Sequence, residues 1–153
     1  MLMPFPLLDR LRDDAPAQAR QLSQSELRRQ VLRDLQSLLN STHYASSGDL
    51  RSYTHVQRSV LNFGVPVLAG RHLSARTFQA IQQELTAAIR CFEPRILSQG
   101  LQLRCLTTGA SRHSLLSIEI QGQLHWTPSP LPFLFHSQLD LDSGHVELKE
   151  AGW

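Results

Sequence analysis

The residues best suited to chemistry stand near the middle of the chain, in the stretch AIRCFEPRIL. There Glu93 and Arg95 flank Pro94, at the point where one apolar run ends and the next begins. An acid and a base at a fixed spacing can act in three ways. Glu93 could be a general acid, the triplet could be a charged docking point for a partner, or Glu93 could simply end a helix while Arg95 pairs with it or with solvent. Composition alone does not separate these three roles.

Acid catalysis of the glycosidase type needs two carboxylates flanking one bond. Glu119 is the only partner for Glu93 worth testing, and it stands on the polar side of an alternating stretch, where a solvated glutamate is the ordinary case. Nothing in the sequence forces these two carboxylates together. Asp140 and Asp142 share one strand face and could bind a cation, but solvated carboxylates beside a turn are the more common arrangement.

Other chemical motifs are missing from the sequence. The 7 histidines have no spacing typical of a metal site, and the chain carries no nucleophile elbow, phosphate-binding loop or dinucleotide fingerprint. Cys91 and Cys105 each fall in an apolar run, so we expect both to be small core residues in a reducing compartment. We therefore expect no catalytic residue, no metal and no cofactor, and binding remains as the function.

Length and composition favour a soluble globular protein. The chain has 153 residues, of which 41% are hydrophobic and 18% charged, and its net charge of +2 is too small to imply nucleic acid. The N-terminus has no basic region of the signal-peptide type, and no apolar run approaches the roughly 20 residues needed to span a bilayer. We expect a cytoplasmic protein, with a flexible leader over residues 1–22 and one domain over residues 23–153.

Helical spacing dominates the chain before Pro94. Ser23 and Glu26 form a capping box that opens a helix ending at Asn40, with leucines on one face and arginines and an aspartate on the other. Residues 56–64 predict a short helix that ends at Gly64 and carries Val56, Val60 and Phe63 on one side. A third helix begins at Ser74 and must end at Glu93, because a residue before proline is pushed out of the helical region.

After Pro94 the apolar period changes to two. Strands are predicted in LQLRCLT, SIEIQGQLHW, PFLFHSQLDL and VELK, with a hairpin-length loop at 107–112 and prolines at 128, 130 and 132 interrupting the ladder. Helices followed by strands predict an α+β fold, in which N-terminal helices pack on a largely antiparallel C-terminal β-sheet.

Five stretches in this order resemble the TssE family of type VI secretion baseplates, which belongs to the wider tailed-phage baseplate-wedge and sheath-initiator family. They are LLDRL at 7–11, LRRQVLRDLQSLLNS in the first helix, SVLNFGVPVLAG at 59–70, FEPRI with its Glu-Pro-Arg triplet, and FHSQLDLDSGHVEL near the C-terminus. The resemblance spans nearly the whole chain. Phe63 stands where tyrosine is frequent in the family, and residues 107–114 and 128–132 depart from the family's pattern.

The resemblance implies a structural subunit that nucleates the contractile sheath through contacts with other wedge subunits and with sheath subunits. It implies partner binding by Glu93, Pro94 and Arg95, and a place in the cytoplasm at the inner face of the cell envelope. It implies that the protein binds neither nucleic acid nor a small-molecule substrate, and that it contacts the membrane only indirectly, through the assembled machine. Sheath strands would extend the sheet, and the acidic lean after Ile96, together with the strands around Phe133–Leu141, makes that region the expected edge.

Two other functions stay open at this point. One is a lysozyme-like peptidoglycan hydrolase that uses Glu93, and the other is a regulatory anti-adaptor with the same fold.

Overall fold

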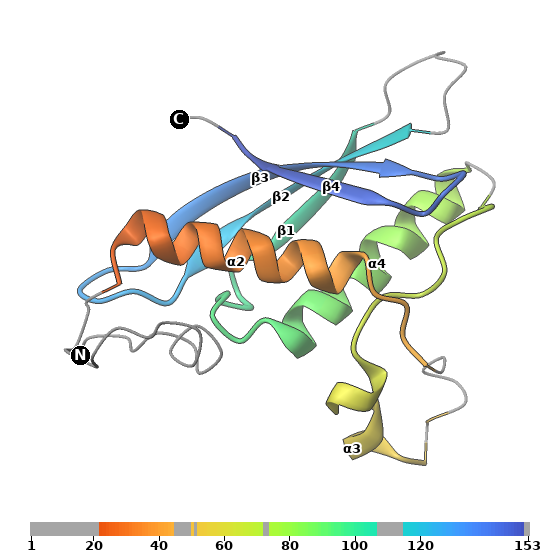
Figure 1. Ribbon diagram of the computed structural model, residues 1–153, viewed down its shortest axis with the longest axis horizontal. Coiled ribbons are helices and arrows are strands. Elements are labelled where there is room, and N and C mark those ends of the chain that lie inside the picture. Colours follow the sequence, from red (N-terminus) through yellow and green to blue (C-terminus); the bar gives the residue numbers. More distant parts are fainter. Residues whose placement is uncertain (1–21, 45–49, 51, 72–73, 107–114, 152–153) are drawn as a thin grey trace, which may run out of the picture.

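The computed structural model describes residues 22–44, 50, 52–71, 74–106 and 115–151, with helices preceding strands along the chain (Figure 1). The helices are α2 (Gln24–Leu39), α3 (Thr54–Gln57), the 3-10 turn η1 (Val60–Asn62) and α4 (Ala75–Phe92). The strands are β1 (Gln102–Leu106), β2 (Leu115–Leu124), β3 (Leu131–Asp140) and β4 (Val146–Glu150). The predicted α+β class is confirmed. The expected leader lies outside the described residues, apart from Leu22, whose side chain is buried.

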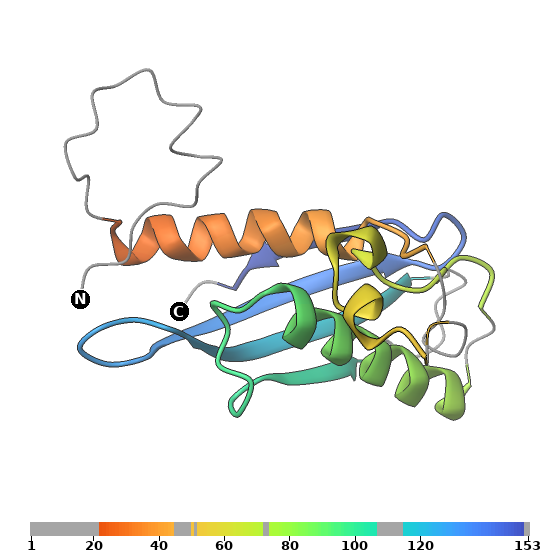
Figure 2. The same cartoon turned by 90° about the horizontal axis from the view of Figure 1, so that it is seen from below.

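The capping box predicted for the first helix is present. The N–H of Glu26 donates to Ser23 Oγ at 3.2 Å, and the N–H of Ser23 donates to Glu26 Oε2 at 2.8 Å, so each residue satisfies a main-chain donor of the other. The apolar stripe of α2 is buried, as its spacing predicts, and includes Leu27, Val31, Leu35, Leu38 and Leu39. This stripe packs the helix onto the sheet (Figure 2).

The helix α4 also begins and ends where the sequence predicts. The N–H of Thr77 donates to Ser74 Oγ at 3.1 Å, which caps the first turn. At the other end Glu93 has φ −119° and ψ 80°, outside the helical region, as a residue before proline should be.

The segment between these two long helices differs from its prediction. In place of one helix there are two short helical turns, α3 and η1, which are separated by Arg58 and Ser59. Of the predicted apolar side, Phe63 packs against the core, whereas Val60 is 84% exposed and does not. Gly64 has φ +131°, and a Cβ built on it would lie 2.4 Å from the main-chain oxygen of Ser41. The glycine is therefore required by close packing of two chain segments as well as by its backbone conformation.

The four strands form one antiparallel sheet in the order β1-β2-β3-β4. Along β2 and β3, buried residues alternate with more exposed ones, so one face of the sheet is buried. The core lies between this face and the helices α2 and α4 (Figures 1 and 2). The expectation that the strand around Phe133–Leu141 is an edge is wrong, because β4 returns along it and pairs Leu139 with Val146 and Phe135 with Glu150. The edge strands are β1 and β4.

The prolines after β2 have different positions. Pro128, which follows a cis peptide bond, and Pro130 lie in the connection between β2 and β3. Pro132 lies inside β3, opposite Gln123, in the part of the strand that β4 does not pair. A residue without an N–H fits there because no neighbouring strand needs that donor. None of the helices in the described ranges is long and apolar enough to cross a membrane.

Candidate functional site

The Glu-Pro-Arg triplet forms the corner where α4 leads into the sheet. Glu93 ends the helix, and two residues beyond it the carbonyl oxygen of Arg95 accepts from the N–H of His125 at 2.8 Å. The next residue, Ile96, forms an isolated antiparallel bridge with Leu124 at the end of β2. The corner is thus fixed to the helix on one side and to the sheet on the other.

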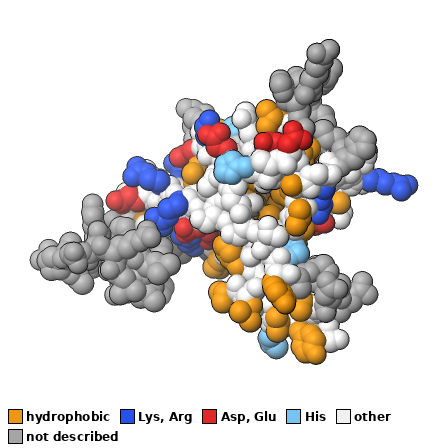
Figure 3. All heavy atoms as spheres, turned by 45° about the vertical axis from the view of Figure 1, so that its right-hand side comes forward, with side chains coloured by type: hydrophobic (Ala, Val, Ile, Leu, Met, Phe, Trp, Pro, Cys, Tyr) orange, Lys and Arg blue, Asp and Glu red, His pale blue; other side chains and the backbone are white. Residues whose placement is uncertain are grey.

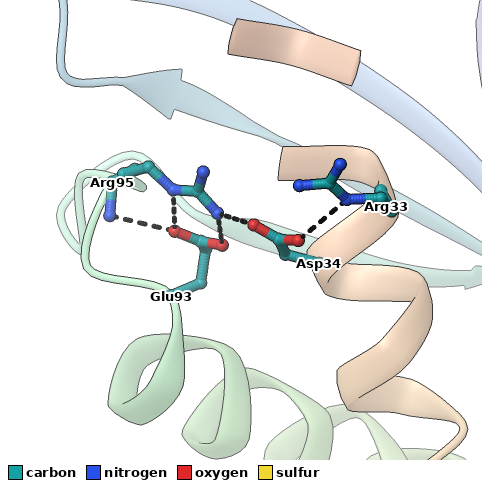
Figure 4. Close-up of polar contacts among 4 residues, drawn as sticks. All are labelled: Arg33, Asp34, Glu93 and Arg95. Atoms are coloured by element: carbon teal, nitrogen blue, oxygen red, sulfur yellow. Dashed lines mark hydrogen bonds and ion pairs between the residues drawn. The ribbon is translucent and has the colours of Figure 1, made fainter. Parts of the chain in front are cut away.

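Within this corner the acid and the base bind each other (Figure 4). Arg95 Nε donates to Glu93 Oε1 at 2.7 Å, and Arg95 Nη2 donates to Glu93 Oε2 at 2.6 Å. The N–H of Arg95 adds a third bond to Glu93 Oε1 at 3.2 Å. The Glu93 side chain is only 4% exposed, against 20% for Arg95. Two parallel bonds between a guanidinium and a carboxylate are the strongest form of such a pair.

Asp34 of α2 joins the same network. Arg95 Nη2 donates to Asp34 Oδ2 at 2.5 Å, and Arg33 Nε donates to Asp34 Oδ1 at 3.3 Å, so charges of opposite sign alternate across the four side chains (Figure 4). Burial alone lowers the pKa of Arg95, but the hydrogen bonds and charges of Glu93 and Asp34 outweigh it and raise that pKa above its ordinary value. Arg95 therefore stays charged and ties the first helix to the corner.

No signal in the sequence points to the part played by Asp34. Its spacing placed it with the arginines on the polar face of the first helix, 61 residues before Arg95. Only the packing of α2 against α4 brings the two together. The buried Nη1 atom of Arg95 has no hydrogen-bond acceptor among the described residues.

The two glutamates considered for catalysis are not brought together. Both oxygens of Glu93 are bound by Arg95, so neither is directed at a substrate. Glu119 lies in β2 opposite Arg104 and His136, on the sheet face away from the buried residues. Leu124, which the corner contacts through Ile96, is about 17 Å further along the strand, since each strand residue advances about 3.4 Å. These two carboxylates do not form a glycosidase pair.

Asp140 closes the turn between β3 and β4. Its Oδ1 accepts from the N–H of Asp142 at 2.9 Å, and its Oδ2 accepts from Ser143 Oγ at 2.8 Å. The main-chain bond from Asp142, followed by the bond from Ser143, lowers the pKa of Asp140 below its usual range. In the described ranges no three His, Cys, Asp or Glu side chains gather so that they could hold a metal ion.

The two cysteines are free and half-buried rather than fully enclosed. Burial raises the pKa of Cys105, whose Sγ lies 3.9 Å from the carbonyl oxygen of Phe78. The thiol therefore stays protonated and acts as a packing group, as its place in an apolar run predicts.

A protruding apolar lobe lies beside the corner. We call α3 and η1 together, residues 53–62, the α3–η1 lobe, and its elements pack on each other but on no other described helix or strand. Val60 is 84% and Leu61 74% exposed, and hydrophobic side chains gather over this part of the surface (Figure 3). The further exposed hydrophobic residues in and around the lobe are Tyr44, Tyr53, Val56 and Val67. Apolar patches of this kind are typical of surfaces that bind a protein partner, a membrane or a ligand.

The base of the lobe is joined to the helix that ends at the triplet. Phe63 packs edge-on against Phe92, with ring centroids 5.4 Å apart, and Phe92 directly precedes Glu93. Next to it the N–H of Val65 donates to the carbonyl oxygen of Ser41 at 2.8 Å. The lobe and the corner thus form neighbouring parts of one surface region on a rigid base.

One edge of the sheet is closed by side chains of α2. Gln36 Nε2 and Asn40 Nδ2 both donate to the carbonyl oxygen of Val146, and the N–H of Val146 donates to Asn40 Oδ1 at 2.9 Å. The N–H of Leu148 donates to Gln36 Oε1 at 2.7 Å. The two amide side chains thus bond three outward main-chain groups of β4, the N–H and carbonyl of Val146 and the N–H of Leu148, as a neighbouring strand would.

The same helix also covers the part of β3 that β4 does not reach. Arg28 Nε donates to the carbonyl oxygen of Pro132 at 3.3 Å. Arg28, Gln36 and Asn40 are separated by multiples of four residues, so they follow one stripe of the helix. Sequence reasoning assigned Arg28 to the solvent face and did not recognise this stripe, because its partners are main-chain atoms more than 100 residues away.

Comparison with known proteins gives one clear relationship. A search of curated proteins finds no match. The family model described as "Baseplate wedge protein gp25" matches residues 25–129, which is well over half of the chain and includes α2, the lobe, the triplet corner, β1 and β2. The chain therefore belongs to the gp25 baseplate wedge family, the family of the type VI secretion subunit TssE.

Proposed function

We propose that this chain is the gp25-type wedge subunit of a type VI secretion baseplate, and that it starts polymerisation of the contractile sheath. Membership of the baseplate wedge family supports a structural role in a phage or type VI baseplate. In this role the protein acts by binding other wedge subunits and sheath subunits, in the cytoplasm at the inner face of the cell envelope.

The observation that carries an assembly function is the exposed apolar lobe beside the triplet corner. Val60 and Leu61 are large, exposed and held on a base fixed by the contact of Phe63 with Phe92. Burying such side chains against a partner is favourable by about 25 cal/mol for each Å² of apolar surface removed from water. We infer that a wedge subunit covers the lobe.

Co-purification with the presumed wedge subunits tests this proposal. Val60→Asp places a charge in the covered surface and is expected to remove the chain from the complex, while its melting temperature stays unchanged because the side chain is already exposed. Gln138→Asp is the matched control, since it adds the same charge on the exposed face of β3. If Val60→Asp assembles normally, the lobe is not the surface that a wedge subunit covers. If the unaltered chain forms no complex with the wedge subunits, the proposed function itself is wrong.

The corner at Glu93, Pro94 and Arg95 is the proposed partner-binding site. Because Arg95 takes both Glu93 oxygens, the corner offers a rigid shape with the exposed parts of Arg95 and Asp34, rather than two free charges. Such a shape can set the register of a partner without losing side-chain freedom on binding.

Alanine substitutions would not isolate this role, since removing one member leaves the other charge buried and destabilises the fold. The double variant Glu93→Leu with Arg95→Met replaces the pair by apolar side chains of similar size. We expect it to fold and to bind the wedge subunits more weakly. Full binding by the folded double variant would show that the charges of the triplet are not needed for docking.

The leader is proposed to make a further wedge contact through LLDRL at 7–11. Leu22 belongs to the buried core, so a deletion that tests the leader should stop at residue 21. Removing residues 1–21 is expected to weaken the complex. A regulatory anti-adaptor would have no need of these residues and would keep its binding.

A further inference from the structure

The polar side chains of the α3–η1 lobe bond to main-chain atoms of the lobe and of the segment just before it. Gln57 Nε2 donates to the carbonyl oxygen of Leu50 at 2.7 Å, and Ser59 Oγ donates to the carbonyl oxygen of Val56 at 2.9 Å. Asn62 Nδ2 donates to the carbonyl oxygen of Gln57 at 3.4 Å. Local bonds of this kind fix short turns, so the lobe has a defined shape although it does not rest on the sheet.

The apolar side chains of the lobe face solvent instead. Val60 and Leu61 are neighbours in η1, where they are 84% and 74% exposed, and the lobe stands out from the body of the protein (Figures 1 and 3). Successive residues of a 3-10 turn point about 120° apart, so a flat surface cannot cover both side chains. We call these two residues the Val60–Leu61 knob. Only a concave partner surface can remove the whole knob from water.

Arg58 gives the lobe a positive charge beside this knob. It directly follows α3, is exposed, and has no carboxylate partner among the residues that the structure describes. In the sequence, Asp49 is the only acid between Asp34 and Glu84. Glu84 already binds Arg71, with Arg71 Nη1 2.7 Å from Glu84 Oε2. A partner surface that brings a carboxylate to Arg58 therefore complements the charge of the lobe.

We propose that the Val60–Leu61 knob inserts into an apolar pocket of a wedge subunit, and that a carboxylate at the rim of this pocket binds Arg58. The inference rests on the proposed function, because it takes the partner to be a wedge subunit, and it adds the chemistry that this subunit must present. Burial of the knob supplies affinity, and the ion pair with Arg58 fixes the orientation in which the pocket meets the lobe. Because the turns of the lobe are fixed before binding, little order has to be gained in the complex.

An anionic membrane would also attract an apolar knob beside an arginine, but it would hold this one weakly. A single basic residue adds little to binding at such a surface. Even a myristoyl chain, which buries more apolar surface than a valine and a leucine side chain together, gives only marginal membrane binding. A pocket that encloses both side chains and pairs with Arg58 therefore accounts better for the knob than a lipid surface does.

Affinity measurements on the full chain with each purified wedge subunit test the charge of the pocket rim. Arg58→Glu is expected to raise the Kd by about tenfold or more, whereas Arg58→Lys keeps the charge and should bind nearly normally. Arg29→Glu is the matched control, because it reverses the charge of an exposed residue near the start of α2, whereas the lobe is joined just beyond the end of that helix. Binding of the unaltered chain should weaken as salt is raised, and Arg58→Gln should lose much of this dependence.

Substitution of Leu61 tests the pocket itself. Leu61→Ala is expected to raise the Kd by about tenfold or more, while Leu61→Met has a similar volume and should bind nearly as well as the unaltered chain. The melting temperature of both variants should stay unchanged, because the Leu61 side chain is exposed.

Three outcomes would overturn the inference. Equal affinities of Arg58→Glu and Arg29→Glu for a wedge subunit that binds the unaltered chain would exclude the rim carboxylate and leave the proposed function standing. Binding of the unaltered chain to vesicles of phosphatidylcholine and phosphatidylserine, abolished by Val60→Asp, would assign the knob to a membrane instead. If the unaltered chain binds no wedge subunit at all, the proposed function fails first, and the pocket fails with it.

Discussion

Arg95 holds both carboxylate oxygens of Glu93, at 2.7 and 2.6 Å, across the proline that separates them in sequence. The pair is compact because Pro94 bends the chain just after the helix ends, so that residues two apart point toward one another. On a helix, residues at this spacing do not meet. The proline therefore does more than stop the helix: it creates the geometry of the ion pair.

Breaking this pair should cost stability. The Glu93 carboxylate is 4% exposed in the intact protein, and Arg95→Ala removes its partner, so we expect the free energy of unfolding to fall by about 3–5 kcal/mol. Urea unfolding followed by circular dichroism measures the loss. Asp34→Ala is the control from the same network. The Asp34 side chain is 38% exposed, so we expect its removal to lower the free energy of unfolding by less than about 1 kcal/mol. Equal losses for the two variants would contradict the assigned burial.

The elements and the position of the triplet were predictable from sequence because their causes are local. A capping box, a residue before proline and the change of apolar period each act within a few residues, and Ser23, Glu26 and Glu93 lie where these signals place them. The same holds for the alternation that buries Ile118 and Ile120 in β2.

What sequence could not supply depends on contacts between distant segments. Arg95 meets Asp34, and Gln36 meets Leu148, only after the helices and sheet have packed. The lobe was mispredicted for a different reason. Val60 has helical spacing but faces solvent, so spacing alone suggested a burial that only Phe63 of the three apolar residues shows. The edge strand was missed because pairing order is not encoded in the pattern of any single strand.

Replacing Gly64 should test the packing of the segment that follows the lobe against Ser41, just beyond the end of α2. Its Cβ would lie 2.4 Å from Ser41 O, so Gly64→Ala is expected to lower the free energy of unfolding by about 2 kcal/mol or more. Gly70 offers a matched control, since it also has positive φ, at +73°, but has nothing within 4 Å of the added methyl. Gly70→Ala should cost only the backbone strain, about 1 kcal/mol. Thermal melts of the two variants decide the point.

Peptidoglycan release should not depend on Glu93. Both of its oxygens bind Arg95, so Glu93→Gln is expected to leave any release at the background level of the unaltered protein. A turbidity assay on isolated cell walls measures this. Activity in the unaltered chain that disappears in Glu93→Gln would favour the hydrolase over the structural subunit.

The turn between β3 and β4 should respond to acid through Asp140. Its pKa is lowered in the fold, so the ionised form is the one the turn stabilises. This stabilisation is present above the ordinary pKa of about 3.9 and is lost as the pH falls through the lower folded value. In an NMR titration the amide signals of Asp142 and Ser143 should shift with a midpoint below that ordinary value. Asp140→Asn should abolish the transition, and a midpoint above 3.9 in the unaltered chain would contradict the sign.

Opening the closed edge of the sheet should change how the protein associates. The double variant Gln36→Ala with Asn40→Ala removes the side chains that bond Val146 and Leu148, so exchange of those two amides should rise by about tenfold or more. The freed edge is expected to promote self-association, which sedimentation velocity measures. Gln83→Ala, on the exposed face of α4, is the control and should change neither property. If the double variant stays monomeric with protected Val146 and Leu148 amides, the side chains of Gln36 and Asn40 do not close this edge.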